Sequence, residues 1–300
     1  DSKKRIQFKL IDLEFVNNRN LSNYFNVYKN SYDRLNQIAS EFNTNENLTD
    51  LSNNLLIPNG ANEFIKTVLN NETSLNIEDQ EFKTVNTVKE RLDRLSANNL
   101  ILGSSFSFNI NSQESIFDEK FYQFRWKFDW VGNLLNQFLT SLSSNQNEEN
   151  KNILGGVSPS QYIKTEIDYI KHWPLGKDHV FALHAFTGIA IPYGNSTNMP
   201  FSRSYFSGGA NDNRAWKAYK LGPGSSNNIN EFNEANFKLS FNLEYRFPIT
   251  GPLKGGLFID FGNVWNIWDD VKDSAMRFDG IEDLSEIAIG SGFGLRYDFD

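Results

Sequence analysis

The chain has 300 residues, of which 14% are aromatic, with 26 Phe; only 39% are hydrophobic, and the mean hydropathy is -0.50. No apolar run approaches the roughly 20 residues that a membrane-spanning helix needs, which excludes a helical membrane protein. The absence of Cys excludes a disulfide framework and a thiolate metal site. A net charge of -8 argues against a nucleic-acid partner, because binding phosphates requires a basic surface.

Alternating apolar and polar residues predict β-strands along much of the chain. The alternation is most regular at 121–131 and 237–249. Successive side chains of a strand point to opposite faces, so each of these strands has one apolar and one polar face. In the first strand the alternation changes phase near Leu10 and Ile11, which indicates a β-bulge. The expected strands are 5–16, 100–110, 121–131, 162–173, 179–193, 237–249, 255–265 and 287–299.

Between the first two strands the alternation gives way to helical spacing. Apolar residues at 77–95 recur every three or four positions, with charged residues between them, and shorter helices are expected at 32–42 and 62–69. An amphipathic helix in this position could bind a partner or could pack on residues of its own loop. The sequence favours packing within the loop.

The lengths of the connections distinguish two all-β folds. Short connections alternate with long ones, and the long ones are 17–99, 132–158, 194–236 and 266–286. Short turns at one end, long loops at the other and about ten residues per strand are typical of a transmembrane β-barrel. A soluble β-sandwich also alternates, but it exposes its polar face and rarely needs so many aromatic residues. We therefore predict an all-β chain forming part of a transmembrane antiparallel β-barrel, with a helical external loop.

Residues that could carry catalysis or bind a metal are few. The three histidines are His172, His179 and His184. They lack the HxH or HxxxH spacing of a metal site, and although Asp168 or Glu166 could orient a histidine, no serine is marked as a nucleophile. The glycines of 290–294 lie on the polar face and are interpreted as making room inside the barrel. We expect no enzyme activity, no metal and no cofactor.

One long connection has a distinctive sequence. Residues 201–226 read FSRSYFSGGANDNRAWKAYKLGPGSS, followed by NLEYRFPI at 242–249, GLFIDFGNVW at 256–265 and GFGLRYD at 292–298. In this order the motifs resemble the C-terminal barrel of the BamA/TamA family, also called the bacterial surface antigen family, whose barrels insert or translocate outer-membrane proteins. The form of the loop is similar to the TamA-like lipoprotein branch of these outer-membrane assembly barrels. Ala215 replaces the usual Gly of the family, and Trp216 replaces Phe or Tyr.

The resemblance implies an architecture for the whole chain. Residues 1–300 would be the C-terminal part of a sixteen-strand barrel in the bacterial outer membrane, supplying about eight strands, the seventh to the fourteenth. Residues 17–99 would form an external loop insertion with helices, and 194–236 a loop that folds into the lumen. Eight strands alone would leave unpaired edges in lipid, so we expect a longer protein that also contains POTRA repeats and the remaining strands.

The resemblance also implies a loop latch. The family's loop tip carries an Arg that pairs with two lumenal acids, and Arg214 occupies that position. By alternation, Glu244 and Asp260 lie on the polar faces of adjacent strands, where one guanidinium can bond to both. From the residues alone, an exposed Arg and two solvated acids remain an alternative. Trp216 is expected to pack on the inner wall or stack on a cation, and Gly262 to leave room. The glycines of the loop are Gly208, Gly209, Gly222 and Gly224.

These expectations lead to two functional hypotheses. The first is a non-enzymatic assembly, insertion or translocation factor that opens its barrel sideways and pairs with strands of a client. Its partners would be outer-membrane β-barrel clients, outer-membrane lipids and accessory assembly subunits, with no nucleic acid. The alternative is a passive outer-membrane channel or receptor plugged by its own loop. An outer-membrane hydrolase is disfavoured because the sequence offers no nucleophile.

Overall fold

The chain divides into two compact units. The computed structural model describes residues 2–17, 23–115, 118–141, 153–154, 157–226, 233–271 and 273–297. The first unit comprises Asp1–Phe15, Asn99–Asp270 and Ser274–Asp300, and the second comprises Val16–Asn98 and Val271–Asp273. No helix in the described part of the chain is long and apolar enough to cross a membrane.

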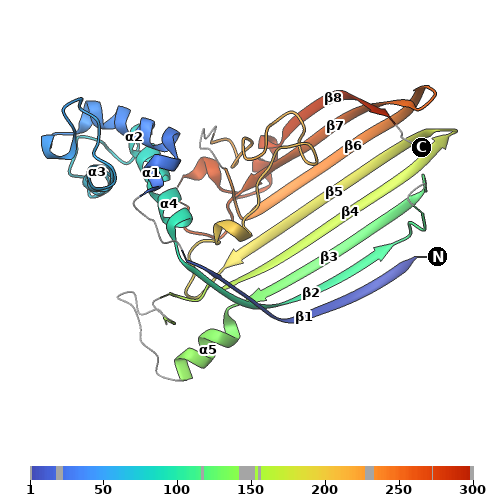
Figure 1. Ribbon diagram of the computed structural model, residues 1–300, viewed down its shortest axis with the longest axis horizontal. Coiled ribbons are helices and arrows are strands. Elements are labelled where there is room, and N and C mark those ends of the chain that lie inside the picture. Colours follow the sequence, from blue (N-terminus) through green and yellow to red (C-terminus); the bar gives the residue numbers. More distant parts are fainter. Residues whose placement is uncertain are drawn as a thin grey trace. The chain divides into compact units, whose positions relative to one another are not determined.

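The first unit is built on one sheet of eight strands whose order follows the chain (Figure 1). The strands are β1 (Lys3–Val16), β2 (Asn99–Asn111), β3 (Phe121–Val131), β4 (Tyr162–Gly176), β5 (His179–Pro192), β6 (Phe237–Thr250), β7 (Leu253–Trp265) and β8 (Ala288–Tyr297). Every neighbouring pair from β2–β3 to β7–β8 is antiparallel. The predicted all-β, antiparallel fold is confirmed.

The two faces of the sheet differ in chemistry. On one face, Arg125 of β3 lies opposite Asp168 of β4 and forms an ion pair of 2.7 Å with it. On the other face, Trp126 packs edge-on against Phe106 of β2, with ring centroids 5.4 Å apart, and Phe241 is 43% exposed. We call the polar face the inner face and the apolar face the outer face. Strand periodicity alone produces this separation, because polar and apolar residues alternate along each strand.

The first strand contains the phase change that its sequence predicts. Its hydrophobic side chains are more than half exposed at Ile6, Phe8, Leu10, Ile11, Leu13 and Phe15. Phe8 packs on Phe106 of the outer face, whereas Asp12 and Glu14 contact Arg203 on the inner side. The outward set therefore passes from even to odd positions between Phe8 and Asp12, as expected at a bulge.

In the described part of the first unit, four short helical segments were not predicted from the sequence. They are α5 (Asn133–Ser141), η3 (Phe201–Arg203), η4 (Ser274–Met276) and η5 (Ile281–Glu286). α5 begins directly after Gly132, which has a φ of 89°, and its Leu139 is buried. A helix this short has too few turns for its periodicity to stand out from an irregular loop.

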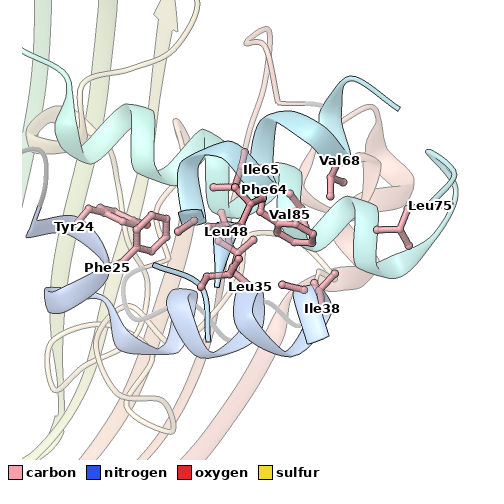
Figure 2. Close-up of a cluster of buried hydrophobic side chains, with 14 residues drawn as sticks. Tyr24, Phe25, Leu35, Ile38, Leu48, Phe64, Ile65, Val68, Leu75 and Val85 are labelled. Atoms are coloured by element: carbon pink, nitrogen blue, oxygen red, sulfur yellow. The ribbon is translucent and has the colours of Figure 1, made fainter. Parts of the chain in front are cut away.

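The second unit is helical and has its own hydrophobic core (Figure 2). Its elements are α1 (Tyr24–Val27), α2 (Lys29–Phe42), η2 (Glu46–Leu48), α3 (Asn59–Leu69) and α4 (Gln80–Ser96). Leu35 of α2, Phe64 of α3 and Val85 of α4 are completely buried. The apolar stripes of the three longer helices therefore pack on one another within the unit, which is how amphipathic helices bury their apolar faces.

Candidate functional site

The connection between β5 and β6 folds back on itself through backbone hydrogen bonds. Tyr205 and Ala235 exchange two backbone bonds of 2.8 Å, and the Gly209 amide donates to the Trp216 carbonyl at 2.8 Å. Gly208 has a φ of 96°, and a Cβ there would lie 2.4 Å from the Lys217 carbonyl oxygen. Only glycine fits both the left-handed backbone and this close approach. The fold-back leaves residues 210–215 as a projecting tip.

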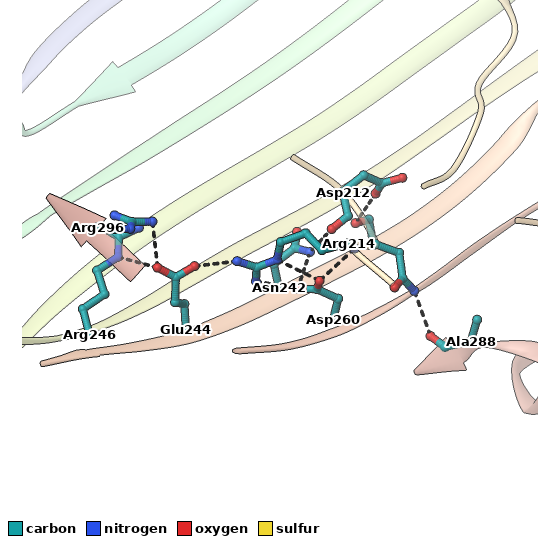
Figure 3. A network of polar contacts seen from close by, with 10 residues as sticks. Asp212, Arg214, Asn242, Glu244, Arg246, Asp260, Ala288 and Arg296 are labelled. Atoms are coloured by element: carbon teal, nitrogen blue, oxygen red, sulfur yellow. Dashed lines mark hydrogen bonds and ion pairs between the residues drawn. The ribbon is translucent and has the colours of Figure 1, made fainter. Parts of the chain in front are cut away.

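Arg214, in the tip, bonds to Asp260 on the inner face of β7 (Figure 3). Its backbone amide and Nε both donate to Oδ2 of Asp260, at 3.0 and 2.9 Å, and Nη2 donates to Oδ1 at 2.7 Å. The Asp260 side chain is completely buried, and Asn242 of β6 donates to it at 2.9 Å. Burying a carboxylate is costly unless it is paired and hydrogen-bonded, and four donors provide that here.

Glu244 of β6 receives the other end of the same guanidinium. Nη1 of Arg214 donates to its Oε2 at 2.6 Å. Its second oxygen accepts from Nε of Arg246 at 2.8 Å and from Nη2 of Arg296 of β8 at 2.7 Å. Glu244 therefore joins three arginines, whereas Arg214 is the only arginine that bonds to Asp260 among the described contacts.

The inner wall is shaped to receive the tip. The guanidinium carbon of Arg214 lies 3.6 Å from the ring centroid of Phe258, which is a close cation–π contact. A Cβ on Gly292 would lie 2.5 Å from that ring, and a Cβ on Gly290 would lie 2.7 Å from the Cβ of Ala215. The inward glycines of β8 thus make room for the tip and for the ring beneath it.

The two residues before Arg214 extend the attachment to three strands. The Asp212 carboxylate forms a 3.0 Å ion pair with Lys238 and accepts a 2.8 Å bond from the Ser240 hydroxyl, both on β6. Asn213 is completely buried, and its side-chain amide donates to the Ala288 carbonyl of β8 at 3.2 Å. Residues 212–214 are therefore bound to β6, β7 and β8 together.

A second attachment of the same connection lies near β1 and β4. Nη2 of Arg203 donates to Glu14 of β1 and lies 3.8 Å from Asp12 of the same strand. Lys164 of β4 donates to the Arg203 carbonyl at 2.8 Å and lies 4.2 Å from the ring centroid of Tyr205. Sequence reasoning missed this attachment, although Asp12 and Glu14 stand on the polar side of the first strand after its bulge.

The remaining predicted site residues are placed as follows. Trp216 lies beside the tip, 3.3 Å from a Cβ built on Gly290, but the ring that stacks on the arginine is that of Phe258. Gly262 does not border the tip: a Cβ there would lie 2.9 Å from the Leu239 carbonyl oxygen of β6. The other loop glycines, Gly209, Gly222 and Gly224, all have positive φ. Gly262 therefore serves close packing between strands, and Gly290 provides the room expected of it.

The histidines are not gathered into one site. His184 contacts Asp168 at 3.0 Å on the inner face, His172 packs on the Phe121 ring, and His179 contacts the Tyr245 hydroxyl at 2.8 Å. Among the described residues no group of three His, Cys, Asp or Glu side chains could hold a metal ion.

Comparison with known protein families provides the wider context for this geometry. A family model described as the Omp85 superfamily domain matches residues 5–299, nearly the whole chain. The chain belongs to the Omp85 superfamily. The expected membership in this group of bacterial outer-membrane proteins is confirmed, and the sheet is part of a transmembrane β-barrel. Its outer face, rich in aromatic and aliphatic side chains, is the lipid-facing side. Similarity to the TamA-like branch stays a prediction.

Individual relatives cover only parts of this Omp85 chain. It is 29% identical over 130 residues to the outer membrane protein assembly factor BamA of Neisseria meningitidis serogroup B (strain ATCC BAA-335 / MC58), covering 39% of this chain and 16% of the relative. A crystal structure of BamA from Haemophilus ducreyi lacking POTRA domains 1-3 is similar with a TM-score of 0.38 and 16% identity. That match covers 66% of this chain and 48% of the other. The chain thus spans less than half the length of either relative.

Proposed function

We propose that the full-length protein assembles or inserts outer-membrane β-barrel proteins without catalysing a chemical reaction. Membership in the Omp85 superfamily and the similarity to an assembly factor support this proposal. The barrel opens sideways between two strands, and the exposed edges pair with strands of a client by main-chain hydrogen bonding. Its further partners are outer-membrane lipids and accessory assembly subunits.

The observation that carries the proposal is the attachment of residues 212–214 to three adjacent strands. A barrel that opens must hold most of its wall rigid while one seam separates. The loop latch, formed by Arg214, Trp216, Glu244 and Asp260, ties the connection to the inner face of β6 and β7, and the neighbouring Asn213 ties it to β8. In this proposal residues 1–300 are the C-terminal part of the barrel, 17–99 form its external insertion and 194–236 form its lumenal loop.

The experiment reconstitutes the full-length protein in lipid vesicles and adds an unfolded outer-membrane β-barrel client. Insertion is followed by protease protection of the client and by its heat-dependent shift in gel mobility. We expect wild-type protein to accelerate insertion over empty vesicles and Arg214→Ala to lose most of that acceleration. Arg277→Ala is the matched control, because Arg277 pairs with Asp279 in the 266–286 connection, away from the latch.

One outcome of this experiment would contradict the assembly proposal. If wild-type protein leaves the insertion rate unchanged while Arg214→Ala raises the ion conductance of the vesicles, the protein is a channel plugged by its own loop. In that case the latch acts as a plug and the assembly proposal is wrong.

A further inference from the structure

The outer face of the sheet carries one charged side chain among the described positions of β2 to β8. Paired residues of adjacent antiparallel strands share a face, so the register defines the outward set of each strand from β2 to β8. Among these described positions there is no Asp, Glu or Arg, and the single Lys is Lys171 of β4. It lies opposite Tyr122 of β3 and Leu183 of β5. A charge facing lipid is unfavourable unless it reaches the membrane interface or a counter-charge.

Aromatic side chains surround this lysine. Its Nζ lies 5.3 Å from the ring centroid of Trp173 and 6.0 Å from that of Tyr122. Trp173 also packs on Phe181, with centroids 5.8 Å apart. Within the described residues the ammonium forms no hydrogen bond or ion pair, so its charge is balanced only by the two ring faces.

The depth of Lys171 in the membrane follows from the aromatic residues along β3. Trp130, at the long-loop end, donates to the Tyr193 hydroxyl at 3.2 Å, and Tyr122 lies near the short-turn end. Eight residues separate Tyr122 from Trp130, or roughly 26 Å along the strand. At the usual strand tilt of about 40° this is about 20 Å across the membrane, most of the apolar band about 25 Å tall that lies between two aromatic girdles. Lys171 therefore lies at the short-turn interface, which faces the periplasm.

We propose that Lys171, Tyr122 and Trp173 form a binding site for the phosphate group of a glycerophospholipid in the periplasmic leaflet. The ammonium supplies the charge, and the tyrosine hydroxyl and the indole N–H supply further donors on either side. The acyl chains lie along the apolar outer face beside Leu183 and Phe181. A lipid fits this position better than a free anion, because the surface around the ammonium is apolar and only a lipid has chains to cover it.

The test titrates dioleoyl phosphatidylglycerol into the full-length protein in uncharged maltoside micelles. Bound lipid is counted by native mass spectrometry. We expect Lys171→Leu to bind the lipid about tenfold more weakly, in line with the loss of one hydrogen bond to a charged group, and Lys171→Arg to keep the wild-type affinity. Lys177→Gln is the matched control, since Lys177 is exposed in the turn after β4 and should bind as wild type.

Two competitors identify the source of the phosphate. Wild type and Lys171→Leu should bind diacylglycerol with the same chains with equal affinity. Excess inorganic phosphate should not displace the phospholipid from the wild-type protein. Displacement by inorganic phosphate would mean a site for a soluble anion, and equal lipid affinity of wild type and Lys171→Leu would mean no site at all. Either result overturns the proposal.

Leu is typical of this face, so the Lys171→Leu variant should keep the heat-dependent gel mobility of a folded barrel. If it does not, Lys171→Gln is compared in the same titration.

Discussion

Two arginines attach the β5–β6 connection to the inner face of the sheet, and they differ in how many bonds they make. Arg214 bonds through its backbone amide, Nε, Nη1 and Nη2 to two carboxylates, one of them completely buried. Arg203 bonds to Glu14 through Nη2, and its Nε has no hydrogen-bond partner in the described part of the chain. Asp12 and Glu14 each have 35% of the side chain exposed.

The difference indicates where the position of the loop is determined. An ion pair whose carboxylate is partly exposed contributes less, because water still solvates that carboxylate, whereas breaking a pair with a buried carboxylate leaves a charge without compensation. We therefore expect the tip to depend strongly on Arg214 and the β1 attachment to act as a weaker second contact. The predictions below test this ranking.

The largest effect should come from Arg214→Ala. It leaves the buried Asp260 carboxylate with Asn242 as its described side-chain donor, while Glu244 keeps Arg246 and Arg296. We expect the free energy of unfolding in lipid vesicles to fall by about 3 kcal/mol, measured by urea titration with tryptophan fluorescence. Arg214→Lys should recover part of this loss, because lysine restores the charge without the planar fork. An unchanged unfolding curve for Arg214→Ala would contradict the latch.

A pair of double-mutant cycles resolves which carboxylate matters. We expect a coupling of about 2 kcal/mol between Arg214 and Asp260, and less than about 1 kcal/mol between Arg214 and Glu244. The reason is that Glu244 retains two other arginines and Asp260 retains none among the described contacts. Unfolding free energies of Arg214→Ala, Asp260→Asn, Glu244→Gln and the two double variants provide both values. Equal couplings would show that the two acids act as one unit.

The space under the tip gives a steric test of the same latch. Gly290→Ala places a Cβ 2.7 Å from both the Ala215 Cβ and the Asn213 Oδ1. We expect a loss of about 1–2 kcal/mol, as for overpacking of a filled interior. Gly294→Ala is the matched control on the same strand and face, since nothing lies within 4 Å of its Cβ. If both variants unfold alike, the tip does not press on β8 in the membrane.

The strands of the fold and the inner-face partners of the tip could be predicted from the sequence, because side chains alternate between the two faces of a strand. Strand alternation identifies the polar face, so Glu244 and Asp260 could be assigned to the inner side of adjacent strands. The family resemblance then supplied Arg214. Alternation does not say how far along a strand a loop makes contact, and for this reason the stacking of Phe258 on Arg214 was not foreseen.

The Arg203 attachment was missed because it joins residues 189 positions apart. No local pattern links Arg203 to Glu14, and the bulge at Leu10 and Ile11 must be placed correctly before Glu14 is known to face inward. Long-range ion pairs of this kind depend on strand register. Hydrophobic patterning shows which face of the sheet a residue occupies, but it does not show which residue of another strand lies beside it.

The smallest effect should come from Arg203→Ala. Because its carboxylate partners on β1 are partly exposed, we expect a loss below about 1 kcal/mol at low salt. The loss should shrink further as salt is raised, since ions screen charges that water reaches. The same titration applied to Arg214→Ala should show little salt dependence, because the Asp260 side chain is completely buried. Urea unfolding of the two variants at low and high sodium chloride measures both. A salt-independent loss of several kcal/mol for Arg203→Ala would mean that the β1 attachment, and not the tip, determines where the loop lies.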